Sequence, residues 1–250
     1  MPLAPTLILS PRYTDSSQIL WRTANEKGWN VERINSFRPP ADFTCEEPVI
    51  YGEPIFNQIM AEHLGIRLPS PPEDFLTKLP VELTGRSIRY MPAEQAREIG
   101  ERVFIKPPNA KTFLAGVFET GAVLPANIEG HEMVLVQDVV DFVHEYRFFA
   151  SPGIFAGSSY IVNKALAKTA WTWNDPPEVH AEAVRFFEND CYPTIRCMHP
   201  EQVEVAVIDI GFIHGIGWKV IELNEPNASG IYNCDPEKVL QILWMATRKT

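Results

Sequence analysis

Two apolar, β-branched runs joined by a glycine-containing turn make up VAVIDIGFIHGIGWKVIELN, residues 205–224, and constrain the fold of this chain more than any other stretch. Such a pattern predicts a β-hairpin. With the turn centred between Gly215 and Ile216, Asp209 and Glu222 lie equally far from its centre and face each other. Directly opposed side chains in an antiparallel pair have Cβ atoms about 4.5–5.5 Å apart. The sequence therefore predicts two carboxylates side by side.

Asn224 adds a third oxygen to this face of the predicted hairpin, because side chains two apart on a strand lie on the same side. Like charges that face each other destabilise a sheet unless a cation lies between them. Hard oxygen ligands without His or Cys favour Mg²⁺ over Zn²⁺. Asp209, Glu222 and Asn224 are therefore predicted metal ligands. The alternative, an exposed ribbon with solvated charges, is disfavoured by the apolar flanking residues.

Four motifs follow one another in a fixed order: VFIKPP with Lys106, VLVQDVV, VIDIG with Asp209, and IELNEPNASGIY with Glu222 and Asn224. This ordered set resembles the ATP-grasp superfamily. The EYRFF run at 145–149 looks like the small, divergent ATP-grasp proteins that carry a Glu-x-Arg strand. The resemblance covers roughly residues 80–250, and its specificity comes from the whole set rather than from any single motif.

The resemblance implies an α/β (α+β) ATP-grasp fold with ATP and Mg²⁺ as cofactors. Proline-rich LPSPPEDFLTKLP at 68–80 is the expected domain boundary. Residues 1–80 are predicted to form a small N-terminal α/β unit, and residues 81–250 the ATP-grasp domain. The resemblance divides the latter into a smaller ATP-binding subdomain, 81–136, and a larger subdomain with the metal site, 137–250.

Strand and helix signals alternate in the N-terminal unit. TLILS at 6–10, WNVERI at 29–34 and PVIYGE at 48–53 indicate strands. A helix is expected between the first two, capped by Asp15 or Ser16, and another follows the third. Strand-helix-strand-helix order is typical of a small parallel sheet.

Lys106 ends a predicted strand that turns at once into two prolines. A lysine at the buried end of a strand needs an anionic partner, and a nucleotide phosphate or a structural carboxylate would supply one. The resemblance assigns Lys106 to phosphate, with Lys111 as a second cation. Arg89 in GRSIRYM lies where ATP-grasp proteins usually place their first phosphate-binding cation, commonly a lysine. Arg86 is the competing choice there, and an exposed arginine is the structural alternative.

EMVLVQDVVDF at 132–142 resembles the connection between the two ATP-binding subdomains. The resemblance makes Gln137, Asp138 and Val139 the hinge, whose main-chain groups would read the adenine edge within an apolar slot. An ordinary sheet strand is compatible with the same letters.

Glu145 and Arg147 lie two apart, and therefore on one face of a predicted strand. A guanidinium next to a carboxylate is oriented for a phosphate or acyl-phosphate oxygen, so Arg147 joins Lys106 as a candidate catalytic residue and Glu145 is assigned to cofactor binding. A structural Glu–Arg pair is the alternative. The lysine- and tryptophan-containing segment 161–177 is either a lid over substrate or a loop packed on the surface.

Composition excludes several other classes of function. A formal net charge of -10 argues against binding nucleic acid through its phosphates. No apolar run approaches the roughly 20 residues of a membrane span. The N-terminus lacks a basic region and a signal cleavage pattern, so we expect a cytoplasmic protein without a membrane partner. The four cysteines show no C-x-x-C spacing, which disfavours a zinc knuckle or a disulfide framework.

Together these features predict an ATP- and Mg²⁺-dependent ligase. It would join a small-molecule or peptide carboxylate to an amine or similar nucleophile through an acyl phosphate. Two alternatives remain open on the same fold: a nucleotide-binding module that serves a partner protein, and a phosphotransferase that acts on a small metabolite. No motif names the substrates, and the oligomeric state is left open.

Overall fold

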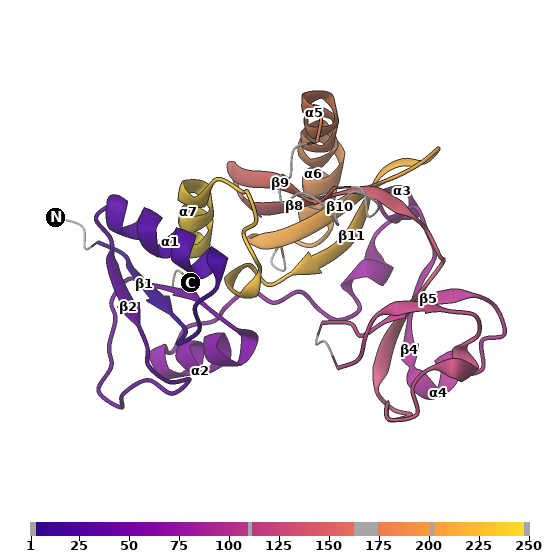
Figure 1. The fold of residues 1–250 in the computed structure, drawn as a ribbon, viewed down its shortest axis with the longest axis horizontal. Helices are drawn as coiled ribbons and strands as arrows, with labels where there is room; N and C mark the ends of the chain where they lie inside the picture. The colour runs from indigo at the N-terminus through magenta and orange to yellow at the C-terminus, as the bar shows by residue number, and fades with distance from the viewer. Residues whose placement is uncertain (1–3, 110–111, 163–174, 201–202, 248–250) are drawn as a thin grey trace.

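Three β-sheets organise the part of the chain that the computed structural model describes, which comprises residues 4–109, 112–162, 175–200 and 203–247. The N-terminal sheet lies at one end of the molecule and a small antiparallel sheet at the other, with a large antiparallel sheet between and above them (Figure 1). Among the described helices, none combines the length and the apolar character that crossing a membrane requires.

The N-terminal sheet is parallel, with strand order β2-β1-β3. Its elements are β1 (Thr6–Leu9), α1 (Asp15–Glu26), β2 (Asn30–Arg33), β3 (Pro48–Tyr51) and α2 (Pro54–Leu64). The helix α1 starts one residue earlier than predicted, because Thr14 and Ser17 cap each other's backbone N–H groups in a capping box. The predicted small parallel α/β unit is confirmed.

The small sheet is antiparallel, with order β4-β7-β5-β6, and has a core of its own. Its elements are β4 (Ile88–Pro92), α4 (Ala93–Ala96), β5 (Val103–Lys106), β6 (Gly116–Phe118), η2 (Gly121–Val123) and β7 (Met133–Gln137). The start of η2 packs against α4 so closely that a Cβ on Gly121 would lie 1.7 Å from the Ala96 carbonyl oxygen. Only glycine fits there.

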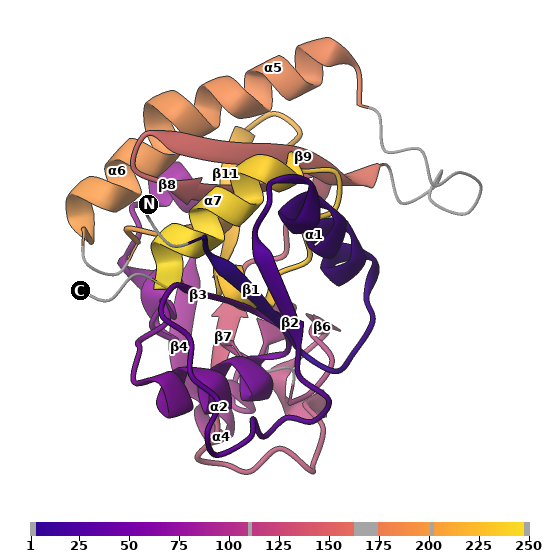
Figure 2. The ribbon, with the colours of Figure 1, turned by 90° about the vertical axis from the view of Figure 1, so that its left-hand side faces the viewer.

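The large sheet is antiparallel, with order β11-β10-β8-β9. Its strands are β8 (Phe142–Ser151), β9 (Ile154–Val162), β10 (Ala206–Ile213) and β11 (Gly217–Asn224). One face is covered by α5 (Pro177–Phe186), η3 (Phe187–Cys191) and α6 (Tyr192–Met198), and the other by α7 (Pro236–Thr247), as Figure 2 shows. The rings of Phe148 and Phe187 stack with centroids 4.1 Å apart in the first of these layers.

One hydrophobic core joins the N-terminal sheet to the large sheet through α7. It contains Leu7, Leu9 and Val49 from the N-terminal sheet, Phe149 and Val207 from the large sheet, and Leu240 and Leu243 from α7. After the proline-rich segment, η1 (Phe75–Lys78) and α3 (Val81–Thr84) pack into the core on the opposite face of the large sheet. The N-terminal unit is thus packed onto the rest of the molecule, and the predicted boundaries at residues 80 and 136 stay predictions.

Candidate active site

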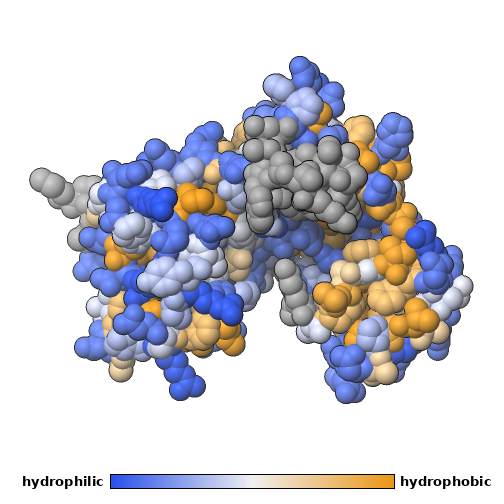
Figure 3. All heavy atoms as spheres, in the orientation of Figure 1, coloured by the Kyte–Doolittle hydropathy of each residue, from blue (hydrophilic) through white to orange (hydrophobic). Residues whose placement is uncertain are grey.

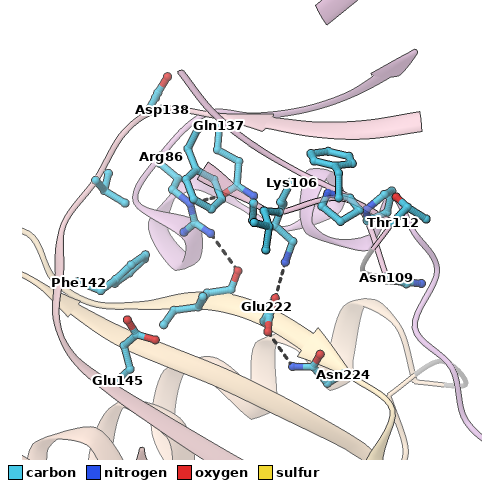
Figure 4. Close-up of a pocket in the computed structure, with 18 residues that line it drawn as sticks. Arg86, Lys106, Asn109, Thr112, Gln137, Asp138, Phe142, Glu145, Glu222 and Asn224 are labelled. Carbon is cyan, nitrogen blue, oxygen red and sulfur yellow. Dashed lines mark hydrogen bonds and ion pairs between the residues drawn. The ribbon is translucent and has the colours of Figure 1, made fainter. Parts of the chain in front are cut away.

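A pocket of about 770 Å³ opens between the small sheet and the large sheet. It continues the hollow that separates the small-sheet lobe from the rest of the molecule (Figure 3). Its apolar part is formed by Phe104, Val140, Phe142 and Ile221, and its polar part includes Lys106, Glu145, Glu222 and Asn224 (Figure 4). Phe104 and Lys106 lie two apart on β5 and so reach the pocket from the same strand face.

A β-bulge in β11 decides which side chain faces Asp209. Near its tip the hairpin pairs Ile213 with Gly217, so its turn is centred half a residue earlier than predicted. The register then shifts by one residue next to Asp209, where Ile221 is the extra residue of β11. These two differences offset each other, and Glu222 faces Asp209 as predicted.

Asp209 forms a buried ion pair with Arg147, its partner on the neighbouring strand β8. Arg147 Nε and Nη2 donate to the two carboxylate oxygens at 2.8 and 2.7 Å, and Asp209 is 0% exposed. Burial raises the pKa of Asp209 to about 6, against the opposing effect of the Arg147 charge. Arg147 also donates to the Gly230 carbonyl at 3.2 Å and lies 5.0 Å from the ring centroid of Tyr232.

Glu222 forms an ion pair with Lys106, which reaches it across the pocket from the small sheet (Figure 4). Asn224 Nδ2 bridges the two carboxylates, at 3.0 Å from Asp209 Oδ2 and 3.2 Å from Glu222 Oε1. Burial alone would raise the pKa of Glu222, but the Lys106 charge and the hydrogen bonds from Lys106 and Asn224 hold it below its usual value. The predicted set of oxygens does converge.

This set fits a hard cation in its chemistry. Two carboxylates and one amide are hard oxygen donors, and rotation of the Asn224 amide would turn its oxygen toward both carboxylates. Lys106 already supplies a positive charge next to Glu222. In the described residues no group of three or more His, Cys, Asp or Glu side chains could hold a metal ion. The metal role of Asp209, Glu222 and Asn224 stays a prediction.

The hinge between the two sheets lies where β7 ends. Asp138 N donates to the Ser87 carbonyl at 3.2 Å, and Ser87 N donates to Asp138 Oδ2 at 2.8 Å. Gln137 Oε1 accepts from Arg86 Nε at 2.7 Å. Both Gln137 and Asp138 line the pocket, beside its apolar wall. Their predicted position at a hinge agrees with this geometry, while their contact with adenine stays a prediction.

Three predicted positions need comment. The structure places Arg86 in the pocket wall instead of Arg89, whose side chain is 45% exposed and lies 3.7 Å from Glu101. Strand alternation explains the difference, because the neighbours of Arg89 on β4 turn inward to the core of the large sheet. Val140 lines the pocket in place of Val139. Lys111 lies outside the described residues, as does most of the segment 161–177.

Sequence reasoning missed the contacts that fix the loop after β11. Asn227 Nδ2 donates to the Ile50 carbonyl at 2.7 Å. The Asn227 carbonyl accepts from Gly52 N at 3.1 Å and from Asn57 Nδ2 at 2.9 Å. Asn57 lies on the buried face of α2, where a polar residue is the one available signal. The N-terminal unit therefore holds the loop that follows the predicted metal ligands.

The three-sheet arrangement and the charged pocket between two sheets define an ATP-grasp protein. Residues 83–242 match the family model for the ATP-grasp domain, R(2)K clade family 2. Because this match spans more than half of the chain, the protein belongs to that family. No curated protein matches the sequence at a significant level.

Solved structures with the same fold support this assignment. The RimK-domain ATP-grasp protein from Sphaerobacter thermophilus DSM 20745 has a TM-score of 0.56 at 13% identity, over 98% of this chain and 100% of that chain. The D-alanine–D-alanine ligase from Coxiella burnetii has a TM-score of 0.56 at 10% identity, over 98% and 95%. The ATP-grasp ligase PsnB, complexed with a minimal precursor, has a TM-score of 0.56 at 13% identity, over 98% and 100%. At these identities the likeness concerns the fold.

Proposed function

We propose that this protein is an ATP- and Mg²⁺-dependent ligase that joins a carboxylate to an amine through an acyl phosphate. The observation that carries the proposal is the row of charges at one end of the pocket. Arg147, Asp209, Glu222 and Lys106 alternate in sign across the two lobes, and an apolar wall suited to a nucleobase forms the other end.

In the proposed reaction an oxygen of the donor carboxylate attacks the γ-phosphorus of ATP, and ADP leaves. The amine nitrogen then attacks the carbonyl carbon of the acyl phosphate and displaces phosphate. Lys106 and Arg147 would offset negative charge on the transferred group. Mg²⁺, held by Asp209, Glu222 and Asn224, would supply further charge neutralisation. Such chemistry depends mainly on positioning and charge, which are the properties that this pocket supplies.

The substrates are proposed to be a small-molecule or peptide carboxylate and an amine. Two structures of the same fold indicate this range, one named as a ligase of D-alanine to D-alanine and one solved with a minimal precursor. The pocket contributes no feature that selects between these sizes.

Titration calorimetry of ATP with and without Mg²⁺ tests the proposal on the parent protein, on Glu222→Gln and on Glu237→Gln. Glu237 is a matched control, because its carboxylate forms a surface pair with Lys27, outside the pocket. We expect Mg²⁺-dependent binding that weakens at least about tenfold in Glu222→Gln, the loss of one charged contact, and is unchanged in the control. A parent protein that does not bind ATP and Mg²⁺ would refute the nucleotide site.

Product analysis then separates the ligase from the alternatives. Carboxylate and amine pairs are screened for ADP release. A ligase yields an amide and free phosphate, whereas a phosphotransferase yields a stable phosphorylated compound. A binding module that serves a partner protein releases no ADP with any pair.

A further inference from the structure

We propose that Arg86 is a positioning residue: a buried clamp that ties the hinge to the bulge of β11 and thereby holds Glu222 opposite Asp209. The contacts of Arg86 stand on their own. Their consequence for metal binding rests on the proposed function, because that function gives Glu222 its role as a ligand.

The guanidinium of Arg86 is almost fully used by protein acceptors. It is 5% exposed, and Nε donates to Gln137 Oε1 at 2.7 Å. Nη1 donates to the carbonyls of Thr84 and Val220, both at 2.8 Å, and Nη2 donates to the Ile221 carbonyl at 3.0 Å. These four bonds leave one of the five N–H groups. A side chain tied in this way is poorly placed to serve as a phosphate-binding cation.

Two of these acceptors exist because of the bulge. In a regular strand, successive carbonyls point to opposite edges. The bulge at Ile221 interrupts this alternation, so that the carbonyls of Val220 and Ile221 both lie within reach of one guanidinium. β11 is an edge strand, and among the described residues no strand pairs with it on that side. Arg86 therefore supplies the donors that a neighbouring strand would otherwise provide.

The bulge controls the metal site through the register of the hairpin. The hairpin tip is fixed by the pairing of Ile213 with Gly217. From that tip, regular pairing would bring Ile221 opposite Asp209, and only the extra residue brings Glu222 there. Loss of the bulge would thus replace a carboxylate by an apolar side chain at this position.

The other end of the clamp lies at the hinge. Gln137 is the last residue of β7, and the Ser87–Asp138 bonds lie next to it, where both chain crossings between the sheets pass. Figure 4 shows Arg86 between this crossing and β11. Burial lowers the pKa of Arg86 to about 10, so the guanidinium remains protonated near neutral pH. One charged group therefore couples the small lobe to the strand that carries Glu222.

Two pairs of variants test the clamp: Arg86→Lys and Arg86→Met, with Arg89→Lys and Arg89→Met as controls. Arg89 lies three residues away and is exposed. Without ligands, hydrogen exchange of the backbone amides of residues 218–224 should be faster in both Arg86 variants and unchanged in the controls. The Mg²⁺ concentration needed for ATP binding should rise about tenfold or more, as for loss of a residue that orients a metal ligand. Metal-free ATP affinity should stay close to that of the parent.

Several results would overturn the clamp. Unchanged exchange in the Arg86 variants would remove its effect on β11. An equal loss of ATP affinity with and without Mg²⁺ would make Arg86 a nucleotide ligand. Unfolding of Arg86→Lys as well as Arg86→Met would assign the side chain to general stability. If the parent protein binds no ATP, the proposed function fails, but the exchange measurement still decides the clamp.

Discussion

At the scale of single residues, the pocket pairs each carboxylate with its own cation. Arg147 binds Asp209 and Lys106 binds Glu222, so the cluster is close to electrically neutral. Lys106 comes from the small lobe and is 13% exposed, whereas Asp209 is buried beneath the pocket surface. Lys106 is therefore the cation that can exchange its carboxylate for a phosphate without unpacking the sheet.

Replacement of Lys106 by Met should weaken binding of ATP with Mg²⁺ by about tenfold or more, because a hydrogen bond to a charged group contributes about 1.5–3 kcal/mol. Lys78→Met is the control, since Lys78 is partly exposed and pairs with Asp74 within one helical turn. Calorimetric titration of both variants measures the difference. Equal ATP affinity in the two variants would show that Lys106 serves only its ion pair with Glu222.

The buried carboxyl of Asp209 should make stability depend on pH. Its pKa is raised from an ordinary value of about 3.9 to about 6, so the folded state binds the proton more tightly than the unfolded state. The stabilisation from protonation is complete below about pH 4 and is lost as pH rises through about 6. A change of this size corresponds to about 3 kcal/mol.

Urea unfolding of the parent and of Asp209→Asn between pH 4 and pH 7 measures this contribution. The free energy of unfolding of the parent should fall relative to that of the variant as pH rises, because the amide does not titrate. A difference between the two proteins that stays constant across this range would contradict the raised pKa of Asp209.

At the scale of elements, glycine at position 211 makes room for the apolar wall of the pocket. A Cβ there would lie 2.4 Å from Phe142 Cδ1 and 2.9 Å from Ile221 Cδ1. Gly211→Ala should therefore push these side chains into the pocket, weaken ATP binding and lower the free energy of unfolding by about 1–3 kcal/mol. Gly100→Ala is the control, since its added Cβ meets nothing within 4 Å. Parent-like ATP binding in Gly211→Ala would contradict this role of the wall.

The same hairpin shows how far the sequence predicts an element. Apolar periodicity located both strands, and the pairing of Asp209 with Glu222 is confirmed. The bulge could not be predicted, because Ile221 is as apolar as its neighbours and the extra residue leaves no trace in the pattern. Two small errors offset each other, so the correct pair followed from an incomplete description of the strand.

Packing also decided positions that alternation alone left open. Arg86 and Arg89 lie near each other in the sequence, but only packing of β4 onto the large sheet settles which of them lines the pocket. Phe104 carried a usable signal, since it lies two residues before Lys106 on one strand. Phe142 carried none, because its place in the pocket depends on the path of the hinge.

At the scale of the whole molecule, the N-terminal unit and the large sheet should unfold together. Val49 of β3 and Leu243 of α7 belong to the core that also contains Phe149 of β8. Val136 of β7 belongs to the separate core of the small sheet. Both valines are 0% exposed, so their replacement by Ala should cost a similar amount, about 1–3 kcal/mol. The two cores predict different distributions of that cost.

Hydrogen exchange under native conditions separates the two cases. Val49→Ala should speed exchange in β1, β3, α7 and β8 alike, because these elements share one core. Val136→Ala should speed exchange in β4, β5 and β7 and leave α7 unchanged. If the effect of Val49→Ala stopped at residue 67, the N-terminal unit would be an independently stable domain. A shared response would instead mean that the unit which fixes the loop after the predicted metal ligands also depends on α7, so that neither part could be removed without loss of the site.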